Sequence, residues 1–144
     1  RFAGDIHFSK KVECDVENVR VPSMILQPVV ENAVNHGIRN IDWEGHIDLS
    51  VERWDDHIEI SVRDNGLGMT GEQIQRVLSK KVHSSSGEGD STGIGMNNVI
   101  SRLELYYERD GLMEIYSEGE GMGTEVVINI PLERSEKNVQ NPDC

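Results

Sequence analysis

The residues leading to Asp64 constrain the fold more than any other part of this chain, because they decide which way its carboxylate points. Between His57 and Asp64, isoleucine or valine occupies every second position. This is the period of a half-buried strand. Asp64 is the next residue on the inward face of that strand. A carboxylate directed at a core is destabilising unless other groups donate hydrogen bonds to it.

Two glycines follow Asp64 closely, at Gly66 and Gly68. Glycine has no side chain, so the backbone at these positions can approach a ligand. An inward acid beside such a backbone predicts a pocket whose floor accepts a hydrogen bond from an amino group. The alternative is an Asn-Gly hairpin turn. However, the residues from Met69 onward begin a helix rather than a return strand, which favours the pocket.

The composition is that of one soluble domain with a strong negative charge. A chain of 144 residues is long enough for a two-layer core. Its formal net charge of −12 disfavours general nucleic-acid binding, which needs a basic face. The sequence has no apolar run of membrane-spanning length and no signal-peptide pattern. Cys14 and Cys144 do not form a disulfide framework or a metal-binding pattern, which favours a reducing cytoplasm.

Five segments alternate like strands, and three have the apolar spacing of helices. The strand-like segments are 5–12, 46–54, 57–64, 112–116 and 124–130. The helix-like segments are 21–36, 70–78 and 93–107. This order predicts an α/β protein, a two-layer sandwich with a mixed sheet of about five strands and about three helices on one face. The domain is predicted to span 1–132, and residues 133–144 to form a solvated tail.

Local signals mark the ends of these elements. Gly37 is the predicted stop of the first helix, and Pro28 is predicted to remove one backbone hydrogen bond and bend its first turns. Thr70 and Gln73 form a capping box at the start of the second helix. Asp55-Asp56 is predicted to turn the chain between two strands of a hairpin.

Residues 79–92 break the pattern with a run of small and polar residues. Loops of this length are usually functional lids or disordered linkers. The Walker pattern Gly-x4-Gly-Lys-Ser/Thr and the protein-kinase signatures are both absent from the sequence. A nucleotide, if one is bound, is therefore held by another architecture.

The first helix carries four polar residues, Glu31, Asn32, Asn35 and His36, at three- and four-residue spacing, so they are predicted to share one side. Asparagine side chains supply neutral oxygens and amide groups, which suit a hard cation such as Mg²⁺ and the oxygens of a phosphate. Glu31 can accept a proton or order a water. The alternative is a solvated helix face, for which asparagine is a poor choice because it disfavours helix interiors.

Gly93-Ile94-Gly95-Met96 lies between the polar loop and the third helix. A glycine turn into a helix N-terminus presents free N–H groups to an anion. The helix dipole contributes only about 0.3–1 kcal/mol, so a divalent cation is expected to neutralise most of a phosphate tail. Alone, the Gly-x-Gly pattern is a weak signal and favours an ordinary helix cap.

Together these segments resemble the Bergerat-fold ATPases shared by gyrase, MutL, the heat-shock chaperone and histidine kinases. Within that superfamily, residues 21–37 are similar to the LytS/YesM-type sensor histidine kinases, with the pattern Pro-x4-Gln-Pro-x-x-Glu-Asn-Ala-x-x-His-Gly. Residues 93–103 resemble the second glycine box, and Gly121-Met122-Gly123-Thr124 the last. The resemblance covers nearly the whole chain up to Leu132.

The resemblance implies a role for each matched residue. Asn32 would bind Mg²⁺, Asp64 would accept from the adenine amino group, and Gly68 would let the base lie against the backbone. Thr124 would lie near the adenine, and Glu31 would polarise the attacking histidine. The phosphates would be lined by Gly93, Gly95 and Met96, under an ATP lid formed by residues 79–92. Other cofactor-binding positions implied by the matched motifs are Asn35, His36, Gly66, Met69 and Ile94.

One position departs from the family, because Asn35 stands where a lysine commonly approaches the phosphates. Lys80, Lys81 or Arg39 could replace that charge from the loops. The departure leaves the catalytic strength of the domain open.

The resemblance implies a sensor protein-histidine kinase that binds Mg²⁺ and ATP. Its expected partners are its own dimerisation domain, which carries the phosphoacceptor histidine, and a response regulator. No helical segment with such a histidine precedes Arg1 here, so we expect the catalytic fragment of a membrane-anchored homodimer, lying in the cytoplasm. Two alternatives stay open: a serine kinase of the anti-sigma type with the same fold, and a non-catalytic nucleotide-binding or docking domain.

Overall fold

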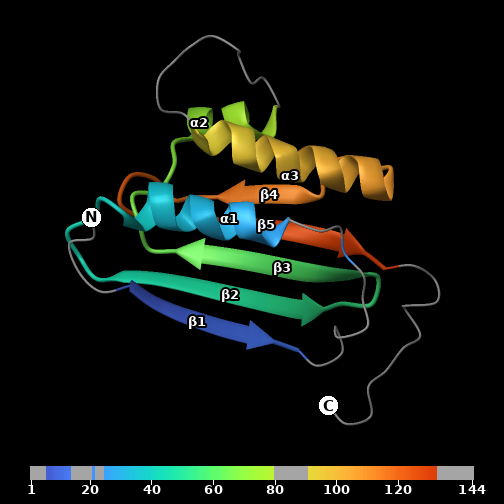
Figure 1. The fold of residues 1–144 in the computed structure, drawn as a ribbon, viewed down its shortest axis with the longest axis horizontal. Helices are drawn as coiled ribbons and strands as arrows, with labels where there is room; N and C mark the ends of the chain where they lie inside the picture. The colour runs from blue at the N-terminus through green and yellow to red at the C-terminus, as the bar shows by residue number, and fades with distance from the viewer. Residues whose placement is uncertain (1–5, 14–20, 22–24, 80–90, 133–144) are drawn as a thin grey trace.

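The computed structural model describes residues 6–13, 21, 25–79 and 91–132, with only the backbone of 91–94. Its five-stranded sheet has the order β1-β2-β3-β5-β4 (Figure 1). The strands are β1 (Ile6–Val12), β2 (Gly45–Arg53), β3 (His57–Asp64), β4 (Met113–Tyr116) and β5 (Thr124–Pro131). β1 runs parallel to β2, and the other neighbours are antiparallel. The predicted mixed sheet is therefore confirmed.

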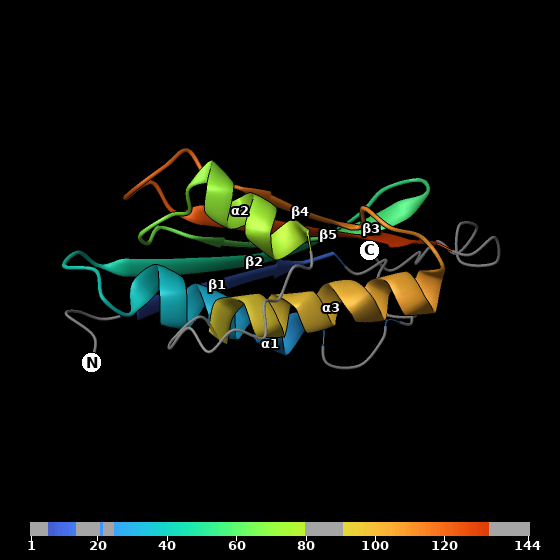
Figure 2. The same cartoon turned by 90° about the horizontal axis from the view of Figure 1, so that it is seen from above.

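The helical elements are α1 (Leu26–Asn32), its π-helical continuation η2 (Ala33–Ile38), α2 (Gly71–Leu78) and α3 (Ser91–Tyr107). Figure 2 shows α1 and α3 on the same side of the sheet, and the two helices contact each other. α2 contacts α3 and β4, so it lies at the β4 edge (Figure 1). The α/β fold with three helices is confirmed.

The core lies between the sheet and the α1 and α3 layer. α3 contributes the apolar stripe predicted from its sequence, and Met96, Val99, Ile100 and Leu103 are all buried. Alternate residues of β5 are buried opposite that stripe, because successive strand side chains point to opposite faces. These β5 residues include Thr124, which places the last predicted site position at the edge of the core.

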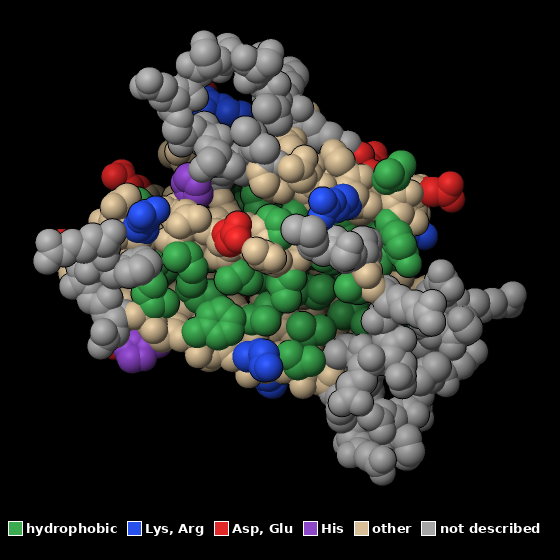
Figure 3. All heavy atoms as spheres, in the orientation of Figure 1, with side chains coloured by type: hydrophobic (Ala, Val, Ile, Leu, Met, Phe, Trp, Pro, Cys, Tyr) green, Lys and Arg blue, Asp and Glu red, His purple; other side chains and the backbone are tan. Residues whose placement is uncertain are grey.

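The helix side of β1 is less covered. Phe8 and Val12 are exposed there, beside the half-buried Leu26, Val30 and Val34 of α1 and η2. Figure 3 shows apolar side chains gathered on this face below α1.

The first helix differs from its prediction at both ends. The described helix begins at Leu26, while residues 22–24 lie outside the described part of the chain. Pro28 therefore sits in the first turn, where its missing N–H would have no intrahelical partner anyway, so the predicted loss of a bond does not occur. Gly37 does not end the helix, because η2 continues to Ile38.

The third helix begins at Ser91 rather than Gly93. The helix therefore starts two residues earlier than its apolar spacing predicts. The last two positions of the predicted lid are thus helical. Ser79 caps the end of α2, and the remaining lid residues, 80–90, lie outside the described residues. The predicted tail, 133–144, also lies outside them.

Other local predictions are confirmed. Thr70 Oγ1 accepts from the N–H of Gln73 at 3.1 Å, and the Gln73 side chain accepts from the N–H of Thr70 at 2.9 Å. The hairpin between β2 and β3 closes with a bond from the N–H of Trp54 to the carbonyl of His57 at 2.8 Å. The Trp54 and His57 rings stack at this end of the hairpin.

Candidate functional site

Asp64 ends β3 with its side chain directed into the protein, as the strand alternation predicts. It pairs with Ile47 of β2 on one side and Thr124 of β5 on the other. Only 6% of the residue is exposed. Burial raises the pKa of the Asp64 carboxyl above its ordinary value of 3.8, and hydrogen bonds from the backbone N–H groups of Gly66 and Thr124 oppose that shift. The Gly66 bond, to Oδ1, is 2.9 Å long.

Three glycines from separate segments surround this acid. A side-chain carbon at Gly37 would lie 2.7 Å from the Asp64 carboxylate. At Gly66, it would lie 1.8 Å from the carbonyl oxygen of Gly37. At Gly123, whose φ is +76°, it would lie 2.2 Å from the Asp64 carbonyl. Only glycine fits these contacts, so the surroundings of the carboxylate are built largely from backbone.

The loop after β3 is fastened to the loop between β4 and β5. The N–H of Gly121 donates to Leu67 O at 2.7 Å, and that of Gly123 to Gly66 O at 3.1 Å. A side-chain carbon at Gly68 would lie 2.1 Å from the carbonyl oxygen of Gly119. The structure therefore gives Gly68 a role in loop packing, and its contact with a base stays a prediction.

Ser117 strengthens the same junction. Its Oγ accepts from the N–H of Met69 at 3.0 Å and donates to Gly123 O at 2.7 Å. Met69 is half-buried and packs against the core. No local sequence signal marks Ser117, because its partners lie in two loops far apart along the chain.

A π-helical turn places Gly37 against Asp64. The N–H of Arg39 bonds to the carbonyl of Val34, five residues earlier, at 3.0 Å. The wider turn puts Ala33 and Ile38, also five residues apart, into the core together. Such turns are rare and frequently occur at functional sites.

The polar residues of α1 and η2 are not equally exposed. Glu31 and Asn35 are exposed, while Asn32 and His36 are partly buried. The π-helical turn starts directly after Asn32, and residues four apart share the same degree of exposure, so the common polar side of these four residues stays a prediction. Glu31 Oε1 accepts from Gln27 Nε2 at 3.0 Å.

Asn32 is distinctive because its side-chain oxygen is buried without a hydrogen-bond partner among the described residues. A buried unsatisfied acceptor is unfavourable and points to a missing donor or cation. The described residues contain no group of three or more His, Cys, Asp or Glu side chains suited to a metal ion.

The glycine box of α3 lies against α1. A side-chain carbon at Gly95 would be 3.8 Å from Pro28 Cβ, an ordinary contact distance. Gly93 and Ile94 belong to the first turns of α3, and Met96 is buried. The contact between α1 and α3 brings this box to the helix that carries Asn32.

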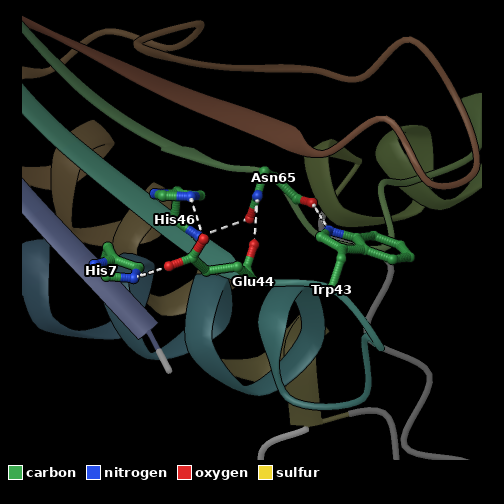
Figure 4. A network of polar contacts seen from close by, with 5 residues as sticks. All are labelled: His7, Trp43, Glu44, His46 and Asn65. Atoms are coloured by element: carbon green, nitrogen blue, oxygen red, sulfur yellow. Dashed lines mark hydrogen bonds and ion pairs between the residues drawn. The ribbon is translucent and has the colours of Figure 1, made fainter. Parts of the chain in front are cut away.

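Like Ser117, Asn65 makes structural contacts that were not predicted from the sequence. It follows Asp64 and bonds to the segment before β2, as Figure 4 shows. The Asn-Gly dipeptide indicated only a possible turn, since the partners of Asn65 are about twenty residues earlier in the chain.

Residues 21–134 match the protein family described as histidine kinase-, DNA gyrase B-, and HSP90-like ATPase. The chain is 33% identical over 125 residues to sensor histidine kinase YpdA of Escherichia coli K12, covering 82% of this chain and 19% of YpdA. It is 30% identical over 138 residues to sensor histidine kinase/phosphatase LytS of Staphylococcus aureus, covering 95% of this chain and 23% of LytS. The chain thus spans about a fifth of the length of these relatives.

Solved structures share the fold. The nucleotide-free catalytic domain of histidine kinase ThkA superimposes with a TM-score of 0.63 at 19% identity, covering 91% of this chain and 82% of that one. The mycobacterial sensor histidine kinase MprB gives a TM-score of 0.61 at 18% identity, covering 88% and 81%. Among the described residues, no helix is long and apolar enough to cross a membrane.

Proposed function

This chain belongs to the family of histidine kinase-, DNA gyrase B-, and HSP90-like ATPases, and from that membership we propose that its site around Asp64 binds ATP. The observation that carries the proposal is the buried carboxylate of Asp64 in its surround of glycine backbone. Adenine presents an amino group that can donate to this carboxylate, whereas guanine presents a carbonyl oxygen at the same position. Thr124, next to Asp64 on β5, is suited to line the same base.

Mg²⁺ would be held by Asn32. The unpartnered side-chain oxygen of Asn32 fits this role, because Mg²⁺ prefers oxygen ligands and usually keeps waters and substrate phosphates in its shell. The ion would supply positive charge close to the phosphates. This charge matters for a chain whose formal net charge is −12.

The phosphates would extend from the base toward the start of α3, where Gly93, Ile94, Gly95 and Met96 lie in its first turns. Asn35 and His36 would border the phosphates from η2. Arg39 is exposed directly after η2, and it is the described candidate for the charge that Asn35 does not provide. Lys80 and Lys81 lie outside the described residues.

In the intact protein, the γ-phosphoryl group of ATP would pass to a histidine of a separate dimerisation domain. The bond from the γ-phosphorus to its bridging oxygen breaks, a phosphorus–nitrogen bond forms, and ADP leaves. The imidazole loses a proton, which the exposed carboxylate of Glu31 is suited to accept. Positioning and charge stabilisation supply most of the catalysis in such transfers. The phosphoryl group would then be relayed to a response regulator, in a membrane-anchored homodimer.

Calorimetry of ATP binding to Asp64→Asn tests the site. Losing a hydrogen bond to a charged acceptor removes roughly 1.5–3 kcal/mol, so affinity is expected to fall by about 10- to 100-fold. Asp110→Asn, an exposed change in the loop before β4, is the matched control and is expected to bind like the wild type. Equal affinities for all three proteins would refute the assignment.

Incubation with labelled ATP and a histidine-bearing dimerisation domain of a relative tests the transfer. An acid-labile phosphoprotein is expected, because phosphohistidine hydrolyses in acid. An acid-stable product would indicate a serine kinase instead. ATP binding without any transfer to an intact acceptor would indicate a binding or docking domain.

A further inference from the structure

All four polar groups of Asn65 are bonded to one short segment before and at the start of β2. Its side-chain Oδ1 accepts from the N–H of His46 at 2.7 Å, and its Nδ2 donates to Glu44 O at 2.9 Å. Its backbone N–H donates to His46 O at 3.2 Å. Its carbonyl accepts from the indole N–H of Trp43 at 2.8 Å. Figure 4 shows the side chain of Asn65 pointing toward this segment.

The segment that holds Asn65 is itself anchored to the edge of the sheet. The carboxylate of Glu44 contacts Nε2 of His7 on β1, and lies 3.9 Å from Nε2 of His46. The two imidazole rings stack with their centroids 5.1 Å apart, because His7 and His46 are paired in register. The bonds of Asn65 therefore end on a segment tied to two strands.

Asn65 also sits between the two residues that define the acceptor. Asp64 precedes it, and the N–H of Gly66 after it holds the Asp64 carboxylate. Gly66 is packed directly against the backbone carbonyl of Gly37, and a side-chain carbon would not fit between them. Gly66 therefore cannot move toward η2. A displacement of Asn65 would thus move the carboxylate and one of its two backbone donors together.

We propose that Asn65 is a positioning residue that gives the site its preference for adenine over guanine. Its bonds to residues 43–46 hold the Asp64 carboxylate at the place where an amino group can donate to it and a carbonyl oxygen is repelled. Asn65 itself does not touch the base. The inference rests on the proposed function, since it assumes that Asp64 receives the base of a nucleotide.

The test compares the affinities of Asn65→Ala for ATP and GTP, each with Mg²⁺, by calorimetry. The wild type is expected to prefer ATP. In Asn65→Ala the ratio of ATP to GTP affinity is expected to fall by about tenfold, the scale of one or two hydrogen bonds. Asn40→Ala, an exposed asparagine after η2, is the matched control and is expected to keep the wild-type ratio.

A merely structural role predicts a different result, in which both affinities fall equally and the ratio is unchanged. That result would overturn the inference. If the wild type itself does not bind ATP, the proposed function fails. If the wild type prefers ATP and Asn65→Ala keeps the same ratio, only the inference about Asn65 fails.

Two milder variants keep the inference testable if Asn65→Ala does not fold. Asn65→Asp retains the acceptor for His46 but places a second acceptor against Glu44 O. Trp43→Phe removes only the indole donor to the Asn65 carbonyl. Both are expected to lower the ratio, Asn65→Asp more than Trp43→Phe, and an unchanged ratio in both would overturn the assignment.

Discussion

The side chain of Asp64 is a titratable acid at a buried position, where a neutral group would make the fold more stable. Because burial raises its pKa in the folded state, the folded protein favours the protonated form. Its contribution to stability is therefore fully present below the ordinary value of 3.8 and is lost as pH rises through the raised pKa. Sites that retain such groups commonly trade stability for function.

This linkage predicts how the wild type and Asp64→Asn diverge with pH. Asparagine does not titrate, so the free energy of unfolding of the wild type minus that of the variant should fall from acid pH toward neutrality. Urea denaturation of both proteins across that range measures the difference, and the other titrating groups largely cancel. A difference that stays flat or rises would contradict the raised pKa of Asp64 in the folded state.

Asn32→Ala is the residue-scale test of the cation. Without its side-chain oxygen, ATP affinity measured with Mg²⁺ should equal that measured with a chelator, because the buried oxygen proposed to bind the ion is gone. Asn40→Ala should keep the gain from Mg²⁺ shown by the wild type. If Asn32→Ala also keeps it, the metal is held elsewhere.

The sequence predicts single residues well only where a local period determines them. The alternation of β3 is enough to direct Asp64 inward, and the structure agrees. The bond between Asn65 and His46 spans 19 positions and that between Ser117 and Met69 spans 48, so no local pattern predicts them. The ligand roles of Asn32, Glu31 and the glycine box stay predictions.

At the scale of elements, the π-helical turn η2 is the main feature that periodicity does not predict. The apolar spacing of residues 26–34 fits an ordinary helix, and Gly37 resembles a stop signal. The core instead takes Ala33 and Ile38 together, which requires the wider turn. Gly37 is a glycine because of the acid it faces, a contact that only the folded chain creates.

Two alanine substitutions in helical segments are expected to have opposite effects. Gly95→Ala meets only ordinary contact inside α3, so the free energy of unfolding should rise by up to about 1 kcal/mol. Gly37→Ala pushes a methyl group against the Asp64 carboxylate. The free energy of unfolding of this variant should fall by about 1–3 kcal/mol. Chemical denaturation measures both.

Gly95→Ala also tests the phosphate role of the glycine box. Gly95→Ala is expected to weaken ATP binding while it stabilises the fold, because the added methyl group would occupy space beside the phosphates. A variant that is more stable and binds ATP normally would remove Gly95 from the phosphate site. A destabilised Gly95→Ala would show that α3 packs more tightly here than its distance to Pro28 indicates.

At the scale of the whole molecule, the sheet order brings the site together. β3 pairs with β5 rather than with its successor β4, and this pairing sets Thr124 beside Asp64. Five strands and three helices follow from sequence periods, but their neighbours in space do not, since any of several strand orders satisfies the same alternation. The strand order is therefore known from the structure and not from the sequence.

Ligand binding should stabilise the whole domain. A ligand that binds only the folded state adds about 2.7 kcal/mol at a concentration 100 times its Kd. ATP with Mg²⁺ should therefore raise the melting temperature of the wild type clearly more than that of Asp64→Asn at the same ligand concentration. Tripolyphosphate, which lacks a base, should give a smaller shift, and an equal shift would mean that the base is not recognised.

The two tryptophans of the hairpin region lie at opposite ends of β2. Trp43 donates to the residue next to Asp64, whereas Trp54 stacks on His57 at the turn between β2 and β3. The chain has only these two indoles. If the site binds a ligand, the fluorescence of Trp43 is therefore expected to change on binding, and that of Trp54, at the far end of β2, is expected to stay constant and serve as an internal reference.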